Sequence, residues 1–483
     1  MTSRFNLAFR GLAASLSAMV TVLGPAHSQS LLRDAEIEQW IDDYSKPLFK
    51  AAGLPADQIE ILLIGDPTPN AFAGGLIMGI HTGLITAADT PNQIEGVIAH
   101  ETGHIAGGHS ARSDEMMSAA TVPMILSLVL AAGAMAAGAT DAGIGLLGLG
   151  QNVGMANALM YSRGQEAAAD QAAVTYLDAT GNSSEGLIQF FGKLRNREIL
   201  TDRRINPYNS YMRSHPLSNE RVTALRERAA ASPSFAAKDT PEEIERLKLI
   251  QAKINGFLQE TNVTLRQYPL SDQSDPAKYA RAVAYYRGSQ LDKAQKEIDA
   301  LIAAHPDNPY YFELKGQMLF EFGQTEQSIE PHLKSVSLAP DKALLRINLG
   351  RALIGGEDIA MYPQAIKELK SALLLEPDNA FAWFELARAY GGLGDEGMAN
   401  LATAESRYHS GAKGEAALFA RRAQQNLKPG SPEYRQASDI IAAARAKAAD
   451  DVPEAPEPET HKKDPAPQKK PDGEIPDPQI LSN

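Results

Sequence analysis

The chain has 483 residues, 59 of them acidic and 46 basic, and carries a formal net charge of −13 with no cysteine. The lack of cysteine excludes disulfide scaffolds, thiolate zinc sites, iron–sulfur clusters and cysteine nucleophiles, so any metal must be bound by His, Asp or Glu. The acidic balance argues against a general nucleic-acid binder, which needs a basic face.

Residues 1–28 have the pattern of a secretory signal peptide. Arg4 and Arg10 precede an apolar run from Leu12 to Leu23, and the segment up to Ser28 resembles a cleavage site. The run is shorter than the ~20 residues of a membrane-spanning helix, which favours cleavage over an uncleaved anchor. We therefore expect cleavage near Ser28, so that the mature chain starts near residue 29 in the periplasm of a bacterium.

Residues 93–109 read QIEGVIAHETGHIAGGH and contain the motif H-E-x-x-H, from His100 to His104. Positions i and i+4 share one face of a helix, so both imidazoles can reach one zinc ion at about 2.0 to 2.1 Å. Glu101 then lies beside the metal, where it can take a proton from water and deliver it to a leaving amine. The motif predicts a peptidase helix whose site still needs a third protein ligand.

The third ligand is not in the metzincin position. In the pattern H-E-x-x-H-x-x-G-x-x-H the last place falls on Ser110, and the nearest histidine, His109, is one residue away. We therefore disfavour that class, and we interpret His109 and His81 as residues without the spacing of a ligand.

Residues 116–162 contain a single charged residue, Asp141. The two uncharged runs on either side are each long enough to cross a bilayer, but several glycines dilute their hydrophobicity. We expect a hairpin of helices here, either soluble or peripherally associated with a membrane.

Residues 162–173 read SRGQEAAADQAA, in which Glu166 and Asp170 are four residues apart. On a helix they share a face, so Glu166 can bind the metal while Asp170 accepts the N–H of a ligating histidine. The alternative is a solvated helix with Arg163 and Glu166 as a surface pair. The upstream motif favours the ligand.

Three segments stand in a characteristic order: NAFAGGLIMGIHTGLI (70–85), VIAHETGHIAGGH (97–109) and SRGQEAAAD (162–170). With them, the chain from Asp34 to Leu258 resembles the zinc metallopeptidase family that includes the HtpX membrane protease, the CAAX prenyl protease and the periplasmic BepA-type proteases.

This resemblance implies one zinc ion per chain, bound by His100, His104 and Glu166, with Glu101 as the general base and Asp170 orienting a ligand. It also implies that Gly75 to His81 forms an edge strand, to which an extended substrate can add by backbone hydrogen bonds.

His215 lies in the segment SHPLSNERV. By the same resemblance it is a candidate catalytic residue near the metal, either as a switchable fourth ligand or as a hydrogen-bond donor to the oxyanion. The alternative is that Pro216 sets a turn and His215 is exposed.

The second half of the chain repeats. Pro306 and Pro340 lie 34 residues apart, and Trp383, Leu386 and Tyr390 occupy the places of a W-x2-L-A-x2-Y unit. A 34-residue helix–turn–helix period is typical of tetratricopeptide repeats, which stack into a solenoid with a concave surface for a protein or peptide. The alternative is a rigid spacer. Two further helices, at 416–427 and 434–447, are expected to cap the array.

The predicted fold is therefore mainly α: an α+β zincin-type metallopeptidase domain with a small edge-exposed sheet, followed by an α-helical tetratricopeptide-repeat solenoid. The predicted boundaries are a signal peptide over 1–28, the metallopeptidase domain over 29–266, the repeats over 267–449 and a disordered tail rich in Pro, Glu and Lys over 450–483.

The predicted function is a zinc endopeptidase of the cell envelope. Its expected substrates are misfolded or stalled outer-membrane and periplasmic proteins held by the repeats, and its expected partner is the outer-membrane β-barrel assembly machinery. The alternative is a chaperone or adaptor whose zinc site is latent or structural. Glu101 favours the enzyme, because a structural site has no use for a base.

Overall fold

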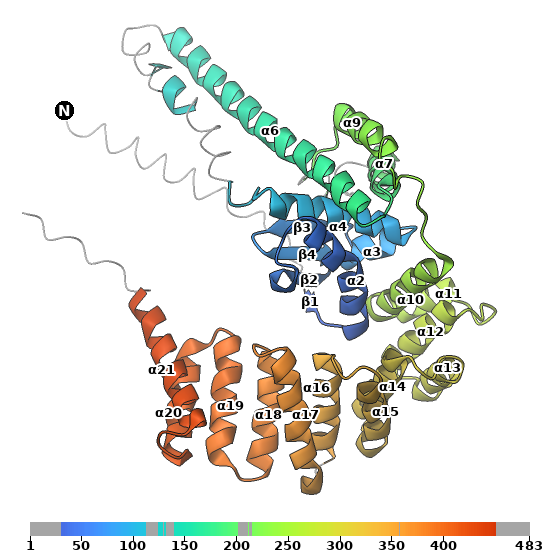
Figure 1. Ribbon diagram of the computed structural model, residues 1–483, viewed down its shortest axis with the longest axis vertical. Helices are drawn as coiled ribbons and strands as arrows, with labels where there is room; N and C mark the ends of the chain where they lie inside the picture. The colour runs from blue at the N-terminus through green and yellow to red at the C-terminus, as the bar shows by residue number, and fades with distance from the viewer. Residues whose placement is uncertain are drawn as a thin grey trace, which may run out of the picture. The chain divides into compact units, whose positions relative to one another are not determined.

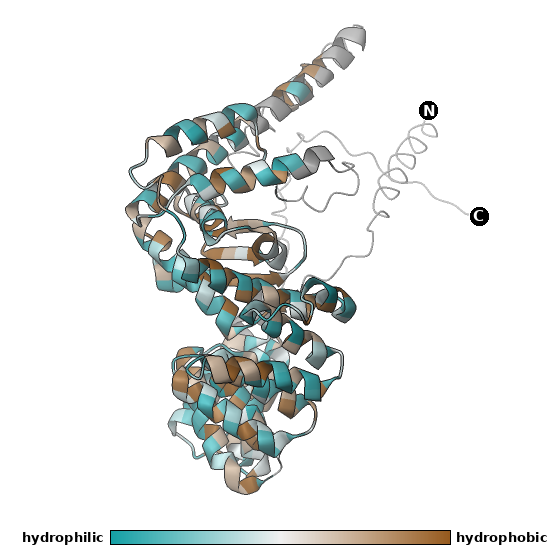
Figure 2. Cartoon of the chain, turned by 90° about the vertical axis from the view of Figure 1, so that its right-hand side faces the viewer, coloured by the Kyte–Doolittle hydropathy of each residue, from teal (hydrophilic) through white to brown (hydrophobic). Residues whose placement is uncertain are grey.

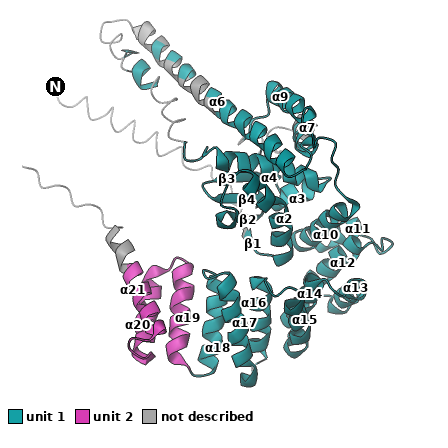
Figure 3. Ribbon diagram, viewed as in Figure 1, with its two compact units in different colours: residues 1–394 teal, residues 395–483 magenta. Residues whose placement is uncertain are grey.

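The structure is a computed structural model, and it describes residues 30–112, 124–128, 130–131, 140–200, 211, 215–356 and 358–450. The predicted signal peptide and nearly all of the predicted tail lie outside these residues. The chain divides into two compact units, residues 1–394 and 395–483 (Figure 3). Helices dominate both units, which confirms the mainly α prediction.

A four-stranded sheet in the order β1-β2-β4-β3 lies in the first unit (Figure 1). β2 and β4 are parallel and pair from Glu60 with Ile77 to Ile64 with His81, whereas the outer pairs are antiparallel. The prediction that residues 75–81 form an edge strand is wrong, because β2 and β3 flank β4 on both sides. The edge strands of the sheet are β1 and β3. The strands span Ser30–Leu32 (β1), Glu60–Gly65 (β2), Ala71–Gly74 (β3) and Ile77–His81 (β4).

One apolar core joins this sheet to the helices around it. Trp40 and Leu48 of α2, Met78 and Ile80 of β4 and Ile98 of α4 are all buried in it. In chain order, the helices of this part are α2 (Ala35–Ala51), η1 (Ala56–Gln58), α3 (Thr82–Ala87), α4 (Pro91–Ala106), α6 (Thr140–Ala179), α7 (Glu185–Leu200), α9 (Asn219–Ala230), α10 (Pro241–Leu258) and α11 (Thr261–Gln267).

Two glycines let α4 pack unusually close to its neighbours. A Cβ atom at Gly96 would lie 2.7 Å from Leu187 Cβ of α7, and one at Gly103 would lie 2.9 Å from Ala169 Cα of α6. Any larger side chain would push the helices apart. The face of α4 that carries the H-E-x-x-H motif is thereby held against α6.

The long helix α6 has two different halves. Its C-terminal half packs across α4, whereas its N-terminal half extends away from the sheet (Figure 1). On that extended half, Leu149 and Met160 are 59% and 62% exposed, and Ile125 and Leu128 before it are also exposed. These exposed side chains count against a hairpin packed into the core, whereas a membrane-associated hairpin over 116–162 stays a prediction, because residues 116–123, 129 and 132–139 lie outside the described residues. In the described part of the chain, no helix has both the length and the apolar character needed to span a membrane.

The second half of the chain consists of consecutive helical hairpins, as the tetratricopeptide pattern predicts. Each of these helices carries both hydrophobic and hydrophilic residues (Figure 2). Small residues lie where helices touch: a Cβ at Gly350 would be 2.7 Å from Leu369 Cγ. Within the first unit these helices are α12 (Asp275–Arg287), α13 (Leu291–Ala304), α14 (Pro309–Glu321), α15 (Thr325–Leu338), α16 (Ala343–Gly355), η2 (Ile359–Met361), α17 (Tyr362–Leu375) and α18 (Ala380–Gly392).

The second unit holds α19 (Glu396–His409), α20 (Lys413–Asn426) and α21 (Pro432–Asp450). Leu401, Ala416, Ala420 and Ile440 form its core. The last two helices cover the two segments expected to cap the array.

Candidate metal centre

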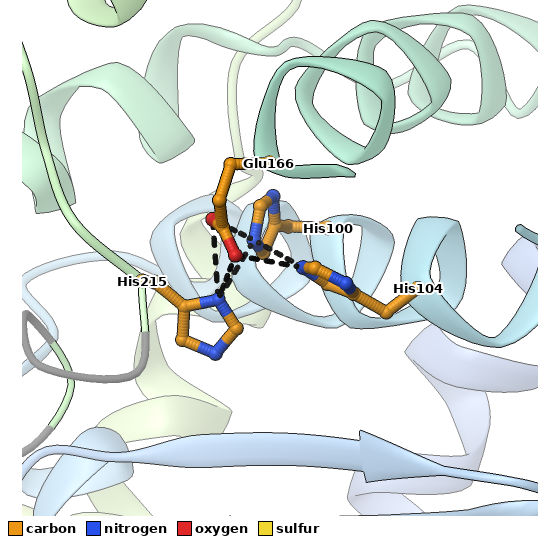
Figure 4. A group of neighbouring side chains, drawn as sticks. All are labelled: His100, His104, Glu166 and His215. Carbon is orange, nitrogen blue, oxygen red and sulfur yellow. Dashed lines mark hydrogen bonds and ion pairs between the residues drawn. The ribbon is translucent and has the colours of Figure 1, made fainter. Parts of the chain in front are cut away.

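Side chains from α4 and α6 converge in one buried site (Figure 4). His100 and His104 are four residues apart on α4, so their rings face the same side, and their Nε2 atoms lie 3.1 Å apart. Glu166 of α6 reaches both rings: its Oε2 lies 3.4 Å from His100 Nε2, and its Oε1 lies 3.4 Å from His104 Nε2. The three residues expected to bind the metal are thus brought together.

His215 joins this group from the segment before α9. Its Nδ1 lies 3.0 Å from Glu166 Oε1 and 3.3 Å from His100 Nε2. The ring is buried and stacks on Tyr211, with the ring centroids 4.6 Å apart. The alternative of an exposed His215 on a turn is therefore wrong.

The donor atoms of this cluster fit a zinc ion. Each of the four side chains offers one ligand atom, and these atoms lie within 4.8 Å of one another. Tetrahedral zinc bound to nitrogen and oxygen at about 2.0 to 2.1 Å needs donors about 3.3 to 3.4 Å apart. The separations given above run from 3.0 to 3.4 Å. Imidazole nitrogen and carboxylate oxygen are also the donors that zinc accepts.

The cluster contains negative charge, as a binding site for a cation should. Burial lowers the pKa of His100, but its hydrogen bonds to Asp170 and Glu166 outweigh burial and raise the pKa to about 9. Burial raises the pKa of Glu166, but the hydrogen bonds and charges of His100 and His215 hold it well below its usual range. An ionised carboxylate therefore faces the donor nitrogens.

Glu101 is fully buried next to His100 on α4, and its Oε1 lies 3.4 Å from His215 Nε2. Neither of its carboxylate oxygens accepts a hydrogen bond from a described residue. Both oxygens are thus available to receive a proton, which is what a general base requires.

Asp170 lies one turn after Glu166, with its Oδ1 3.0 Å from His100 Nδ1. At this distance a carboxylate can orient a ligating imidazole. Arg221 holds both carboxylates in place: its Nη1 lies 2.6 Å from Glu166 Oε2, and its Nη2 donates to Asp170 Oδ1 at 2.9 Å. Sequence reasoning missed Arg221, because an arginine in the first turn of a helix normally lies on the surface.

His109 also contacts the cluster, though not as one of the four converging donors. Its Nδ1 lies 2.8 Å from Nδ1 of His104, the ring nitrogen that does not face Glu166. α4 ends at Ala106 with Gly107 as its C-cap, and Gly108, with φ +60°, reverses the chain. The imidazole then lies over Gly107, where a Cβ would be 2.4 Å from His109 Nε2. In the sequence, the only sign of this reversal is the pair Gly107 and Gly108.

His81, the other histidine left aside in the sequence, lies elsewhere. It ends β4, where its Nδ1 is 3.4 Å from Thr68 Oγ1 and 3.7 Å from Asp66 Oδ2. It takes no part in the cluster.

Comparison with known proteins agrees with this geometry. Residues 33–229 match peptidase family M48. A stretch of 196 residues is 30% identical to Metalloprotease YcaL of Escherichia coli (strain K12), and the match covers 39% of this chain and 71% of that protein. The chain belongs to peptidase family M48 and is a zinc metallopeptidase.

Longer matches extend into the repeats. The Beta-barrel assembly-enhancing protease of Escherichia coli (strain K12) is 24% identical over 84% of this chain and 82% of its own length. The Putative beta-barrel assembly-enhancing protease of Vibrio cholerae serotype O1 is 24% identical over 76% of each chain. The chain thus combines an M48 metallopeptidase with tetratricopeptide repeats.

Proposed function

We propose that this chain is a zinc endopeptidase of the bacterial cell envelope that hydrolyses misfolded or stalled outer-membrane and periplasmic proteins. The observation that carries the enzymatic part is Glu101, a buried carboxylate that lies beside a metal-binding cluster and to which no described residue donates a hydrogen bond. The names of the relatives, which are β-barrel assembly-enhancing proteases, support the class of substrate and the assembly machinery as partner.

In this proposal, His100, His104 and Glu166 hold the zinc ion and Asp170 orients His100. Bound zinc supplies a Lewis acid that polarises the scissile carbonyl and acidifies water. Glu101 takes a proton from the attacking water and gives it to the leaving amine. The burial of the site keeps bulk water away from these charges, which strengthens their interaction.

His215 has two proposed roles that exclude each other at any one moment. As a fourth ligand it closes the site, because Nδ1 lies as near to Glu166 and His100 as the ligands lie to each other. Released from that position, it can donate a hydrogen bond to the oxyanion. If the first role limits turnover, H215A is expected to cleave faster than the wild type; if the second does, it is expected to cleave more slowly.

We propose further that residues 29–266 form the catalytic domain and that residues 267–449 hold the client. The predicted signal peptide supports a periplasmic location. The exposed side chains of Ile125, Leu126 and Leu128, and those of the extended half of α6, support peripheral association of residues 116–162 with a membrane.

The test is zinc analysis combined with casein cleavage, on the wild type and on E101Q. We expect both proteins to hold one zinc ion and only the wild type to cleave. Zinc with no cleavage in either protein would instead support the chaperone or adaptor with a latent site.

A further inference from the structure

A cavity of about 420 Å³ lies between the start of the catalytic part and the repeat helices of the same unit. β1, β2 and the start of α2 line one side, and α10, α14, α16 and α18 line the other. Its size falls within the range of about 300 to 1,000 Å³ that is usual for ligand pockets. Most of its wall is apolar, with Leu63, Phe257 and Phe381 among the lining residues.

A carboxylate without a cationic partner opens onto this cavity. Glu313 of α14 accepts a hydrogen bond from Asn348 Nδ2 of α16 at 3.0 Å, and both residues line the cavity. In the described part of the chain, none of the ion pairs includes Glu313. A carboxylate in apolar surroundings is costly unless a cation or several donors compensate it.

The nearby basic groups are already engaged. Lys253 of α10 is buried, and its Nζ lies 2.8 Å from Asp34 Oδ2 and 3.0 Å from Glu36 Oε2. Burial raises the pKa of Glu313 to about 7, and the charges of Asp34 and Glu36 add to this effect while Lys253 opposes it. One lysine thus serves two carboxylates, and the third remains uncompensated.

Arg33 on the cavity wall is engaged as well. Its Nε lies 2.7 Å from Glu38 Oε1 and its Nη2 lies 2.8 Å from Glu376 Oε1. The cavity therefore has an excess of negative charge, which an incoming cation would neutralise.

We propose that this cavity binds a lysine or arginine side chain of an extended client segment, with the ammonium or guanidinium group on Glu313 and the flanking apolar residues against Phe257 and Phe381. The identity of the occupant as a client rests on the proposed function. Leu258 and Phe381 are 46% and 45% exposed, so apolar surface is open to an arriving chain. Asn348 remains able to donate to a client backbone carbonyl once a cation engages Glu313.

The test measures binding of fluorescent apolar peptides to the full zinc-loaded chain carrying E101Q, which prevents cleavage. Three peptides differ only at the central residue: lysine, norleucine or glutamate. We expect the lysine peptide to bind about tenfold more tightly than the norleucine peptide. Adding E313Q, which keeps the acceptor for Asn348, is expected to abolish this preference without weakening the norleucine peptide.

The matched control is E326Q, which removes one exposed carboxylate from α15 and leaves the cavity intact. Equal binding of the lysine and norleucine peptides, or the same loss in E326Q as in E313Q, would overturn the proposal. The chain's own Lys-rich segment 461–470 is also tested as a separate peptide. If it binds more tightly than every lysine client peptide, the assignment of the cavity to a client is overturned. Casein cleavage by the wild type is scored separately, so lysine selectivity without cleavage sinks the proposed function and leaves the cavity site standing.

Discussion

Replacement of His109 by phenylalanine is expected to weaken zinc binding, although His109 is not among the proposed ligands. A ligating imidazole is oriented by the partner of its other ring nitrogen, and loss of that partner costs about 10- to 100-fold in metal affinity. Asp170 is this partner for His100 at 3.0 Å, and His109 is the partner for His104 at 2.8 Å. H109F keeps the ring and loses the nitrogen, so we expect a loss of about 1.4 to 2.7 kcal/mol of binding free energy.

The assay is competition for zinc between the full chain and a fluorescent chelator. H109N is the diagnostic variant, because its carbonyl can accept the same proton from His104 and should restore most of the affinity. H305F removes an exposed histidine of the repeats and serves as the control. A zinc affinity of H109F within twofold of the wild type would refute the reasoning. Equal losses in H109F and H109N would show that ring packing on Gly107 matters instead.

Three further predictions concern stability. Burial raises the pKa of Glu95 on α4 from 4.5 to about 8. The unfolded chain therefore loses this proton at lower pH than the folded chain. The free energy of unfolding should fall as the pH rises from 4.5 to about 8, by up to about 1.4 kcal/mol per pH unit. E95Q should lack this fall, and melting temperatures of both proteins over this pH range measure the difference. If the melting temperatures of the wild type and E95Q changed with pH in the same way, the prediction would be contradicted. R221M leaves Glu166 and Asp170 buried without their cation, so thermal unfolding of the zinc-loaded protein should show a loss of about 3 to 5 kcal/mol, and a loss below about 1 would count against this role. G350A places a Cβ 2.7 Å from Leu369 Cγ and should cost about 1 to 3 kcal/mol by calorimetry, whereas G391A, with nothing within 4 Å, should cost nothing.

The parts of the site that the sequence predicts are those fixed by one helix. The spacing of His100, Glu101 and His104 sets their directions once α4 forms, and the same holds for Glu166 and Asp170 on α6. The repeats are predictable for a related reason: a 34-residue period ties each helix to its neighbour.

The parts that the sequence misses depend on contacts between distant segments. Arg221 reaches the carboxylates only because α9 packs beside α6, and His109 returns to His104 only through the reversal at Gly108. The position of β4 inside the sheet follows from its parallel pairing with β2, which no local pattern encodes. The apolar run before Glu166 leaves a soluble and a membrane-associated hairpin open, because composition does not distinguish a buried helix from an extended one with exposed apolar residues.

The close crossing of α4 and α6 at Gly103 has a consequence for the ion itself. Two of the proposed ligands come from α4 and one from α6, so the distance between the two helices determines how far apart the donors stand. A side chain at position 103 would widen that distance beyond the roughly 3.3 to 3.4 Å that zinc bonds of about 2.0 to 2.1 Å need. The fit of the donors to zinc thus depends on a contact of the backbone, and a methyl group placed 2.9 Å from Ala169 Cα would change it without altering a single ligand.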